Sequence, residues 1–288
     1  MKVIATPSRT KEILEKFDLT AKKNYGQNFL VEPGIVSKIA SHAIMSDHCV
    51  AVEIGPGIGA LTQMLAQKAN KVIAYEIDER LPQVLAYSLE ECTNVEVVLQ
   101  DFMEVDLKEL VSRYPDQDVI IAANLPYYIT TPILFKIFES EANIKRITVM
   151  MQKEVADRFS AQVNTKDYNA LSVITQYKTT VKQVVKVPRN VFNPKPNVDS
   201  AVLQFEFKEK DESIQEELFF EMIKACFKQR RKTILNNFGE WFGDKEKARG
   251  ILQDVSIDEK RRAESCTLEE FICLYRRIEH DYICKSEN

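Results

Sequence analysis

Short apolar runs alternate with helical patterns through the first half of the chain. Five runs have the length and composition of buried strands: Cys49–Ile54, Lys71–Tyr75, Val95–Leu99, Asp118–Ala123 and Ile147–Met151. Apolar residues three or four positions apart predict helices between or before them, over Ile35–Ala43, Leu61–Lys68, Leu81–Leu89 and Pro132–Glu139. This alternation predicts βαβ units and a mostly parallel sheet.

The pattern changes in the second half. Three β-rich runs, Ala170–Tyr177, Lys182–Val187 and Ser200–Phe207, predict a sheet that ends in antiparallel strands. Lys208–Ser213 contains no apolar residue and is the expected linker. Helical periodicity then follows over Glu217–Lys228, Arg231–Phe242, Glu246–Leu252 and Leu268–Ile278. The fold class is therefore α/β, with a Rossmann-like sheet domain over residues 1–208 and a small all-helical domain over residues 209–288.

Composition excludes several protein classes. With 288 residues, 45% hydrophobic and 28% charged, the chain is neither collagen-like nor wholly disordered. No apolar run approaches the roughly 18–20 residues that a membrane span needs, and Met1–Lys23 has no apolar core of a secretory signal. The six cysteines form no CxxC pair and the three histidines lie far apart, so we expect reduced thiols, a cytoplasmic location and no metal.

Positive charge is concentrated in two segments although the net charge is −4. Five basic residues and no acidic one lie between Tyr177 and Val198: Lys178, Lys182, Lys186, Arg189 and Lys195. Five more lie in the second segment: Lys224, Lys228, Arg230, Arg231 and Lys232. Phosphate contacts need such local density, which the net charge can hide, whereas a solvated surface explains either segment alone.

Glycines cluster after the first predicted strand. Gly55, Gly57 and Gly59 form a G-x-G-x-G pattern at a strand-to-helix junction, two residues after Glu53. Glycine there allows a sharp turn and close approach of the backbone to a ligand. Neither the dinucleotide fingerprint nor the phosphate loop matches, so a tight structural turn remains an alternative reading of this feature alone.

Two acids strengthen the ligand reading. Glu76, which ends the next strand 21 residues after Gly55, can accept both hydrogen bonds of a ribose diol. Asp101 follows the third strand, where it can accept from an adenine amine. Each acid alone can be a surface charge, but together they outline an adenosine-shaped site. Because no phosphate-binding lysine accompanies them, S-adenosylmethionine is the favoured ligand.

Asn124–Tyr127, the sequence N-L-P-Y, follows the fourth strand and fits the pattern [NDS]-x-P-[YFW]. This pattern is typical of enzymes that methylate a planar amine, whose nitrogen lone pair is delocalised. The Asn124 side-chain oxygen and a backbone carbonyl near Leu125 can accept the two amine hydrogens and orient the lone pair. Pro126 stiffens the loop, and Tyr127 offers a face on which a base can stack. Catalysis would then be mostly orientation and electrostatics.

These motifs, with others along nearly the whole chain, resemble the ribosomal RNA adenine dimethyltransferase family. The matching stretches are Lys23–Leu30 (KNYGQNFL), Glu53–Thr62 (EIGPGIGALT), Glu76–Asp78, Gln100–Asp101, Asn124–Tyr127, Gln152–Arg158 (QKEVADR), Val191–Val202 (VFNPKPNVDSAV) and Phe227–Thr233 (FKQRRKT). One departure is Asn169, where the family often has glycine; asparagine also tolerates the left-handed region.

The resemblance implies specific roles. Cofactor contacts would fall on Asn28, Leu30, Gly55, Glu76, Asp101 and Asn124. The target adenine would stack between Tyr127 and Phe192, with Asn124 holding N6 and Leu125 and Pro126 completing the catalytic loop. Contacts with RNA are expected from two groups, Lys186, Arg189 and Lys195 near Phe192, and a basic helix with Lys228, Arg230, Arg231 and Lys232.

The implied reaction converts two adjacent adenosines, in the 3′-terminal hairpin of small-subunit (16S) ribosomal RNA, to N6,N6-dimethyladenosine. It would consume S-adenosylmethionine, release S-adenosylhomocysteine and need no metal. The expected partner is the assembling small ribosomal subunit, without DNA or membrane, and the expected state is a monomer.

Three alternatives are weighed against this interpretation. Resistance methyltransferases of large-subunit RNA usually carry N-I-P-[YF] and lack the Gln152–Arg158 stretch. DNA adenine and protein glutamine methyltransferases more often read [DN]-P-P-[YFW]. A mainly non-catalytic assembly factor need not keep Glu53, Glu76, Asp101 and Asn124 together, as this chain does.

Overall fold

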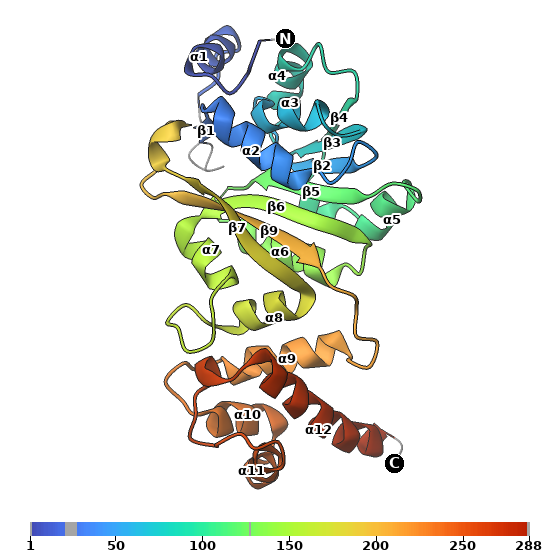
Figure 1. Ribbon diagram of the computed structural model, residues 1–288, viewed down its shortest axis with the longest axis vertical. Helices are drawn as coiled ribbons and strands as arrows, with labels where there is room; N and C mark the ends of the chain where they lie inside the picture. Colours follow the sequence, from blue (N-terminus) through green and yellow to red (C-terminus); the bar gives the residue numbers. More distant parts are fainter. Residues whose placement is uncertain (1, 21–27, 127, 287–288) are drawn as a thin grey trace. The chain divides into compact units, whose positions relative to one another are not determined.

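The computed structural model describes residues 2–20, 28–126 and 128–286. The chain divides into two compact units (Figure 1). The first comprises Met1–Ala156 and Val181–Phe207, and the second comprises Asp157–Thr180 and Lys208–Asn288. These units differ from the 1–208 and 209–288 division in one segment, because residues 157–180 pack with the C-terminal helices. The buried Tyr168, for example, donates a hydrogen bond of 3.1 Å from its hydroxyl to the carbonyl of Cys266.

A seven-stranded sheet has the order β4-β3-β2-β5-β6-β9-β7. Its strands are β2 (Val50–Ile54), β3 (Lys71–Glu76), β4 (Val95–Leu99), β5 (Val119–Asn124), β6 (Ile144–Gln152), β7 (Thr179–Val187) and β9 (Ser200–Phe207). The pairs β3–β4, β2–β3, β2–β5 and β5–β6 are parallel, whereas β6–β9 is antiparallel. The prediction of a mostly parallel sheet with an antiparallel end is confirmed.

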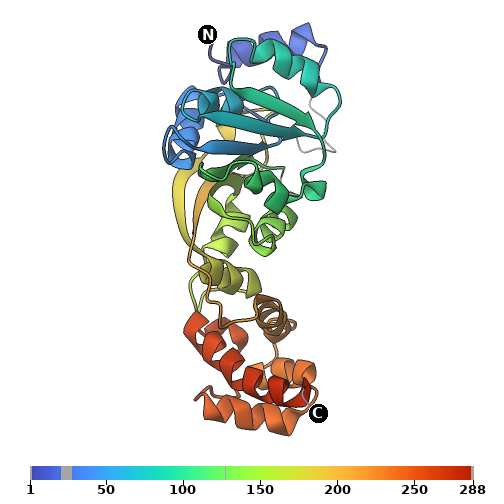
Figure 2. The same cartoon turned by 90° about the vertical axis from the view of Figure 1, so that its right-hand side faces the viewer.

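Helices connect the parallel strands (Figures 1 and 2). They are α3 (Ala60–Ala66), α4 (Leu81–Ser88), α5 (Leu107–Ser112) and α6 (Thr130–Glu139). Helix α2 (Pro33–Ala43) precedes β2, and α7 (Lys153–Phe159) follows β6. Short 3-10 turns are η2 (Phe102–Glu104) and η3 (Arg189–Val191). Helix α2 contacts β5, β6 and α3. The strands at the centre of the sheet are buried along their length because helices cover them, as expected for parallel strands.

Two elements near the N-terminus were not anticipated. Helix α1 (Pro7–Lys16) begins at Thr6, whose hydroxyl accepts from the Arg9 amide. A two-stranded sheet pairs β1 (Phe29–Leu30) with β8 (Phe192–Asn193) in antiparallel register. The first of these lies in a segment that is polar overall, and the second is too short for a periodic signal.

The strand predicted over residues 170–177 is wrong, because α8 (Ala170–Lys178) is a helix. Asn169 caps it, accepting a 2.8 Å hydrogen bond from the Leu171 amide, while the Ser172 hydroxyl accepts from the Asn169 amide. With φ of −157° Asn169 is extended, so no left-handed backbone is involved. The β-branched composition suggested a strand, but the burial of Ser172, Val173, Ile174 and Thr175 within a helix outweighs that propensity.

The second unit contains four further helices: α9 (Glu216–Cys226), α10 (Ile234–Phe242), α11 (Lys245–Asp254) and α12 (Leu268–Ser286), with the 3-10 turn η4 (Ala263–Ser265). Phe219 is fully buried and contacts Tyr177 and Tyr275, with ring centroids 5.1 and 5.4 Å apart. The four predicted C-terminal helices are confirmed. The basic stretch 228–232 lies between α9 and α10 and is not helical, which corrects the expectation of a basic helix.

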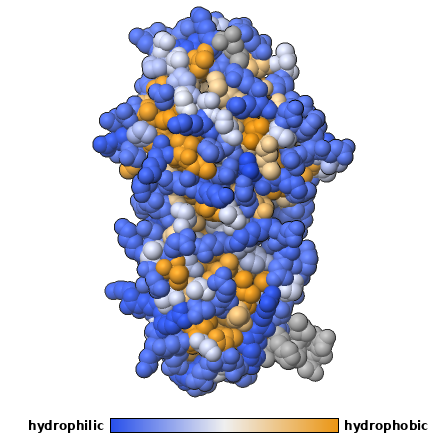
Figure 3. All heavy atoms as spheres, viewed as in Figure 1, coloured by the Kyte–Doolittle hydropathy of each residue, from blue (hydrophilic) through white to orange (hydrophobic). Residues whose placement is uncertain are grey.

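The surface is largely polar. Hydrophilic side chains cover most of the face seen in Figure 3, with small apolar areas between them. Among the described residues, no helix combines the length and the apolar character that crossing a bilayer requires.

Candidate active site

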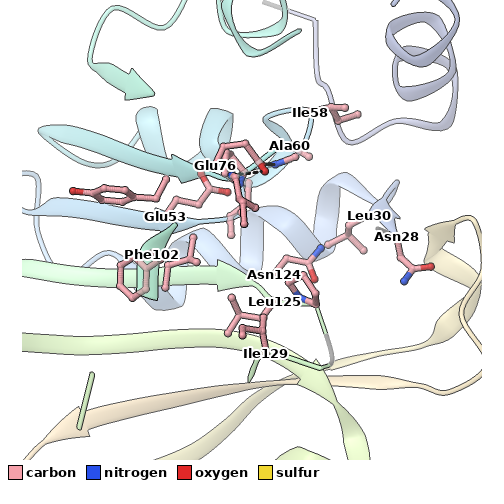
Figure 4. A pocket seen from close by; sticks show the side chains of 18 of the residues that line it. Asn28, Leu30, Glu53, Ile58, Ala60, Glu76, Phe102, Asn124, Leu125 and Ile129 are labelled. Carbon is pink, nitrogen blue, oxygen red and sulfur yellow. Dashed lines mark hydrogen bonds between the residues drawn. The ribbon is translucent and has the colours of Figure 1, made fainter. Parts of the chain in front are cut away.

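A cavity of about 370 Å³ opens at the carboxyl ends of β2, β3 and β5 in the first unit (Figure 4). Ligands of open parallel sheets bind at this edge. Nine of the ten residues to which the sequence assigned cofactor binding or catalysis line it: Asn28, Leu30, Gly55, Glu76, Asp101, Asn124, Leu125, Pro126 and Phe192. Tyr127 lies outside the described residues. Residues separated by more than a hundred positions are thus brought to one site.

The glycine loop joins β2 to α3 in a backbone conformation that suits glycine. Gly55 has φ of 68°, and a Cβ there would meet no atom within 4 Å, so the backbone itself forms the cavity wall. Gly59 has φ of 92°, and a Cβ there would lie 3.1 Å from Leu89 and 3.2 Å from the Ser88 hydroxyl. The loop therefore combines an open face for a ligand with tight packing behind it.

Glu76 ends β3 and is held by backbone amides. Its Oε1 accepts 2.9 Å hydrogen bonds from the amides of Ile77 and Asp78, and its Oε2 accepts a 3.3 Å bond from the amide of Gly57. Burial raises the pKa of Glu76, and the three amides oppose this shift. Figure 4 shows the carboxylate directed toward the segment that contains Ile58 and Ala60. The acceptor is therefore fixed in position at the cavity wall.

Glu53 is the second carboxyl group in the cavity wall. Its side chain is 1% exposed, and its Oε2 has no hydrogen-bond partner among the described residues. Burial raises the pKa of Glu53 to about 8; Thr62 opposes the shift and the nearby Glu76 adds to it. The sequence drew attention to Glu53 only as the acid before the glycines. A buried acceptor without a donor is unusual, and a cationic or hydrogen-bonding ligand would satisfy it.

Asp101 reaches the cavity from the end of β4. Its Oδ1 accepts a 2.8 Å hydrogen bond from the Met103 amide and so caps η2. Within η2, Phe102 is 4% exposed, lines the cavity and packs edge-on against Tyr75, with ring centroids 5.8 Å apart. The cap holds the carboxylate at the wall and the two rings support it.

The loop after β5 is anchored on both sides. The Leu125 amide donates to the carbonyl of Met150, and the carbonyl of Pro126 accepts from the Ile129 amide and the Thr130 hydroxyl at 3.2 and 3.1 Å. Leu125 is 2% exposed. These contacts restrain the loop and do not involve the side-chain amide of Asn124.

Asn124 presents a free amide to the cavity. Its backbone pairs with Met150 in the sheet, yet its side chain forms no hydrogen bond with any residue that the structure describes. In the view of Figure 4, Asn124 and Leu125 are drawn closer to Leu30 than to Phe102. The side chain is therefore placed to bond a ligand.

The two-stranded β1–β8 sheet positions Phe192 at the cavity. Leu30 and Phe192 are register partners in the β1–β8 pair, are 5% and 6% exposed, and both line the cavity. Their pairing joins the N-terminal segment to a loop more than 160 residues later. The apolar wall beside Asn124 is thereby formed by two segments distant in sequence.

Most of the cavity residues that sequence reasoning missed are apolar. They include Val36, Ile39, Tyr75, Ile129 and Ile133, together with the exposed Tyr128. On the chain they read as ordinary core positions of helices and strands, so no local signal distinguished them. Among the described residues, no cluster of His, Cys, Asp and Glu side chains has an arrangement suited to a metal ion.

The two basic segments have different surroundings. Lys186 and Lys195 are exposed and form no ion pair with the described residues, and Arg189 donates to the Asn197 carbonyl at 2.8 Å. Their charge is therefore not neutralised within the first unit.

In the second basic segment, most of the positively charged side chains lie close to a carboxylate. Lys228 and Lys232 approach Glu240 at 2.7 and 3.6 Å, and Arg230 lies 3.5 Å from Glu264. Arg231 is exposed and has no ion-pair partner in the described part of the chain. The second segment is therefore less available to phosphate than its sequence suggested.

Comparison with known proteins gives a consistent result. The family model described as "Ribosomal RNA adenine dimethylase" matches residues 18–276. Proteins of Bacillus mycoides and Bacillus cereus named "Ribosomal RNA small subunit methyltransferase A" are each 48% identical over 95% of this chain and 97% of their own length.

Two solved structures are similar. A dimethyladenosine transferase from Plasmodium falciparum has a TM-score of 0.73 at 27% identity, covering 86% of this chain and 96% of that one. The 23S rRNA methyltransferase ErmE has a TM-score of 0.68 at 27% identity, covering 88% and 100%. The family match spans most of the chain, and its members include close relatives over almost their full length. The chain therefore belongs to the ribosomal RNA adenine dimethylase family.

Proposed function

We propose that this protein transfers methyl groups from S-adenosylmethionine to N6 of two adjacent adenosines in the 3′-terminal hairpin of small-subunit ribosomal RNA. The observation that carries the proposal is the convergence of Glu76, Asp101 and Asn124 on one cavity at the sheet edge. The relatives named for small-subunit methylation, 48% identical over 95% of the chain, support this choice of substrate.

The wall formed by β2, β3 and β4 fits an adenosine-containing cofactor without phosphates. Glu76 offers a fixed carboxylate to a ribose diol, and Asp101 offers one to an adenine amine. The Gly55 backbone leaves room for close approach, and the unpartnered Oε2 of Glu53 suits the cationic part of the ligand. When bound, the cofactor supplies an electrophilic methyl group; the protein supplies its orientation.

The Asn124 loop fits the acceptor adenine. The side-chain oxygen of Asn124 accepts one N6 hydrogen, and the Leu125 backbone is placed beside it for the other. Accepting both hydrogens favours a more tetrahedral nitrogen, which localises its lone pair and aims it at the methyl donor. Phe192 provides an apolar face for the base, and Tyr127 is the proposed second face. No strong base is needed because the amine becomes acidic only as the methyl group transfers.

A large-subunit methyltransferase is the main alternative, since the chain is also similar in structure to ErmE at a TM-score of 0.68. The loop sequence N-L-P-Y and the full-length relatives named for the small subunit favour the first reading. A non-catalytic assembly factor would not require Asn124 with an unused amide beside two fixed carboxylates.

The remaining assignments follow from the same proposal. Residues 1–208 would carry the catalytic site, and residues 209–288 would contact ribosomal RNA. Lys186, Arg189 and Lys195, and from the second segment Arg231 in particular, would contact phosphates. We also propose that the protein acts in the cytoplasm as a monomer, needs no metal and does not act on DNA.

The direct test is transfer of labelled methyl from S-adenosylmethionine to unmethylated small subunits, large subunits, free RNA and DNA, followed by digestion to nucleosides. We expect N6,N6-dimethyladenosine only on small subunits. Label on large subunits would favour the resistance-type alternative. Failure to bind the cofactor would leave the assembly-factor reading.

A further inference from the structure

Tyr128 is an exposed aromatic side chain at the edge of the active-site cavity. Its exposed fraction is 61%, the largest among the exposed large apolar side chains of the described residues, and it is the only aromatic one among them. It lines the same cavity as Asn124 and Pro126. An aromatic ring left open to water beside a nucleic-acid site needs an explanation beyond packing.

The ring is held on a restrained loop. The Pro126 carbonyl, two residues before Tyr128, accepts from Ile129 and Thr130 immediately after it, and Leu125 is anchored to β6. The Tyr128 hydroxyl has no hydrogen-bond partner in the described part of the chain. The residues that follow Tyr128 are thus anchored, while its ring remains exposed.

The cavity beside Asn124 serves one base at a time. Asn124 supplies one side-chain amide to the cavity. In the proposed function, it and a loop carbonyl near Leu125 accept the hydrogens of a single amino group. The proposed substrate contains two adjacent adenosines, so while one base is in the cavity its neighbour remains outside, one nucleotide away along the strand. An unstacked purine in water favours an aromatic face.

We propose that Tyr128 is a stacking platform for the base next to the target adenine, and so helps to select a substrate in which two purines follow each other. This inference rests on the proposed function of the same site. Stacking on an aromatic side chain favours binding by roughly 5- to 150-fold per base, independent of base hydrogen bonds. Tyr128 would act by positioning the strand, without contact with the methyl group.

The test combines changes in the protein with changes in the substrate. Small subunits are prepared with both adenosines, or with one adenosine of the pair replaced by a pyrimidine, which stacks less strongly. We expect Tyr128→Ala to lower kcat/KM about tenfold on the first substrate and less than threefold on the second. Tyr128→Phe, which keeps the ring, is expected to recover most of the loss. Met45→Ala, another exposed apolar residue, is the matched control and is expected to have no effect.

Two results would overturn the inference. One is an equal loss for Tyr128→Ala on both substrates, which would indicate a contact with something other than the neighbouring base. The other is no loss on either substrate. Unchanged cofactor affinity of each variant establishes that the cavity is intact. Failure of the unaltered protein to methylate small subunits would instead contradict the proposed function.

Discussion

The polar side chains at the two ends of the cavity differ in whether they already have hydrogen-bond partners. At the glycine-loop end, Glu76 is already bonded to three backbone amides and Asp101 to one. At the other end, the Asn124 side-chain amide has no bond to a described residue and shares the cavity wall with the apolar Leu125, Leu30 and Phe192. Fixed carboxylates recognise a ligand that must be bound in one orientation. A free amide among apolar side chains is suited to a group whose hydrogen bonds matter during the reaction.

This difference predicts which changes alter cofactor affinity and which alter the rate of methyl transfer. Interactions made equally with ground state and transition state strengthen binding, whereas those that strengthen in the transition state accelerate the reaction. We therefore expect changes at the glycine-loop end to alter cofactor affinity, and changes at the Asn124 end to alter turnover.

The largest effect is expected for Asn124→Ala. Loss of the acceptor leaves the N6 lone pair delocalised, so methyl transfer should fall by roughly 10²–10³-fold or to background. Cofactor affinity, measured by calorimetry, should change by less than about threefold because Glu76 and Asp101 are untouched. Turnover near that of the unaltered protein would contradict the role of Asn124.

The next effect concerns Glu76→Ala. Loss of a charged acceptor for a ribose diol should weaken cofactor binding by roughly 10- to 100-fold. Glu76→Gln keeps the shape and one acceptor, so its loss should be smaller. Turnover at saturating cofactor should be largely retained in both variants. Unchanged affinity in calorimetry would remove Glu76 from the cofactor site.

A pH dependence is expected from Glu53. Its pKa is raised to about 8 by burial in the free protein, so the group is largely protonated at neutral pH. A cationic ligand favours the ionised form, and affinity for S-adenosylmethionine should rise with pH up to about 8 and then level off. S-adenosylhomocysteine lacks the sulfonium charge and should show a weaker rise.

The same group has an effect of opposite sign on the stability of the free protein. Because the folded state binds the proton more tightly than the unfolded state, Glu53 lowers stability progressively as pH rises from about 4.5 toward about 8. Glu53→Gln should flatten the pH dependence of cofactor affinity and raise Tm at pH 8. If the affinity of this variant kept the original pH profile, another group would be responsible.

The smallest effect is expected from the basic segments, which belong to neither end of the cavity. Replacing Lys186 and Lys195 by alanine should reduce the salt slope of subunit binding by about 1.5–2, because both lysines are free of ion pairs. Replacing Arg230 and Arg231 should reduce it by about 1 or less, since Arg230 lies 3.5 Å from Glu264. Equal slopes for the two double variants, measured between about 50 and 200 mM salt, would show that the Glu264 contact does not compete with RNA.

The sequence identified many features of the fold correctly because their signals are local. The strands β2 to β6 appear as apolar runs. Glu76 and Asn124 end their strands, and the glycines and Asp101 lie shortly after theirs. Parallel strands end at one edge of a sheet, so proximity of these residues follows from topology alone. The prediction failed for α8, where β-branched residues suggested a strand but tertiary burial of the helix prevailed.

The polar side chains and glycines at the sheet edge follow from the sequence alone, because each belongs to a short motif at the end of a strand. Tertiary structure alone decided three other features. Leu30 pairs with Phe192 at the cavity wall, and Glu240 and Glu264 neutralise part of one basic segment. Folding also buries Glu53 with its Oε2 unpartnered among the described residues. Each depends on contacts that no short motif specifies, because burial and charge pairing arise only when the chain is folded.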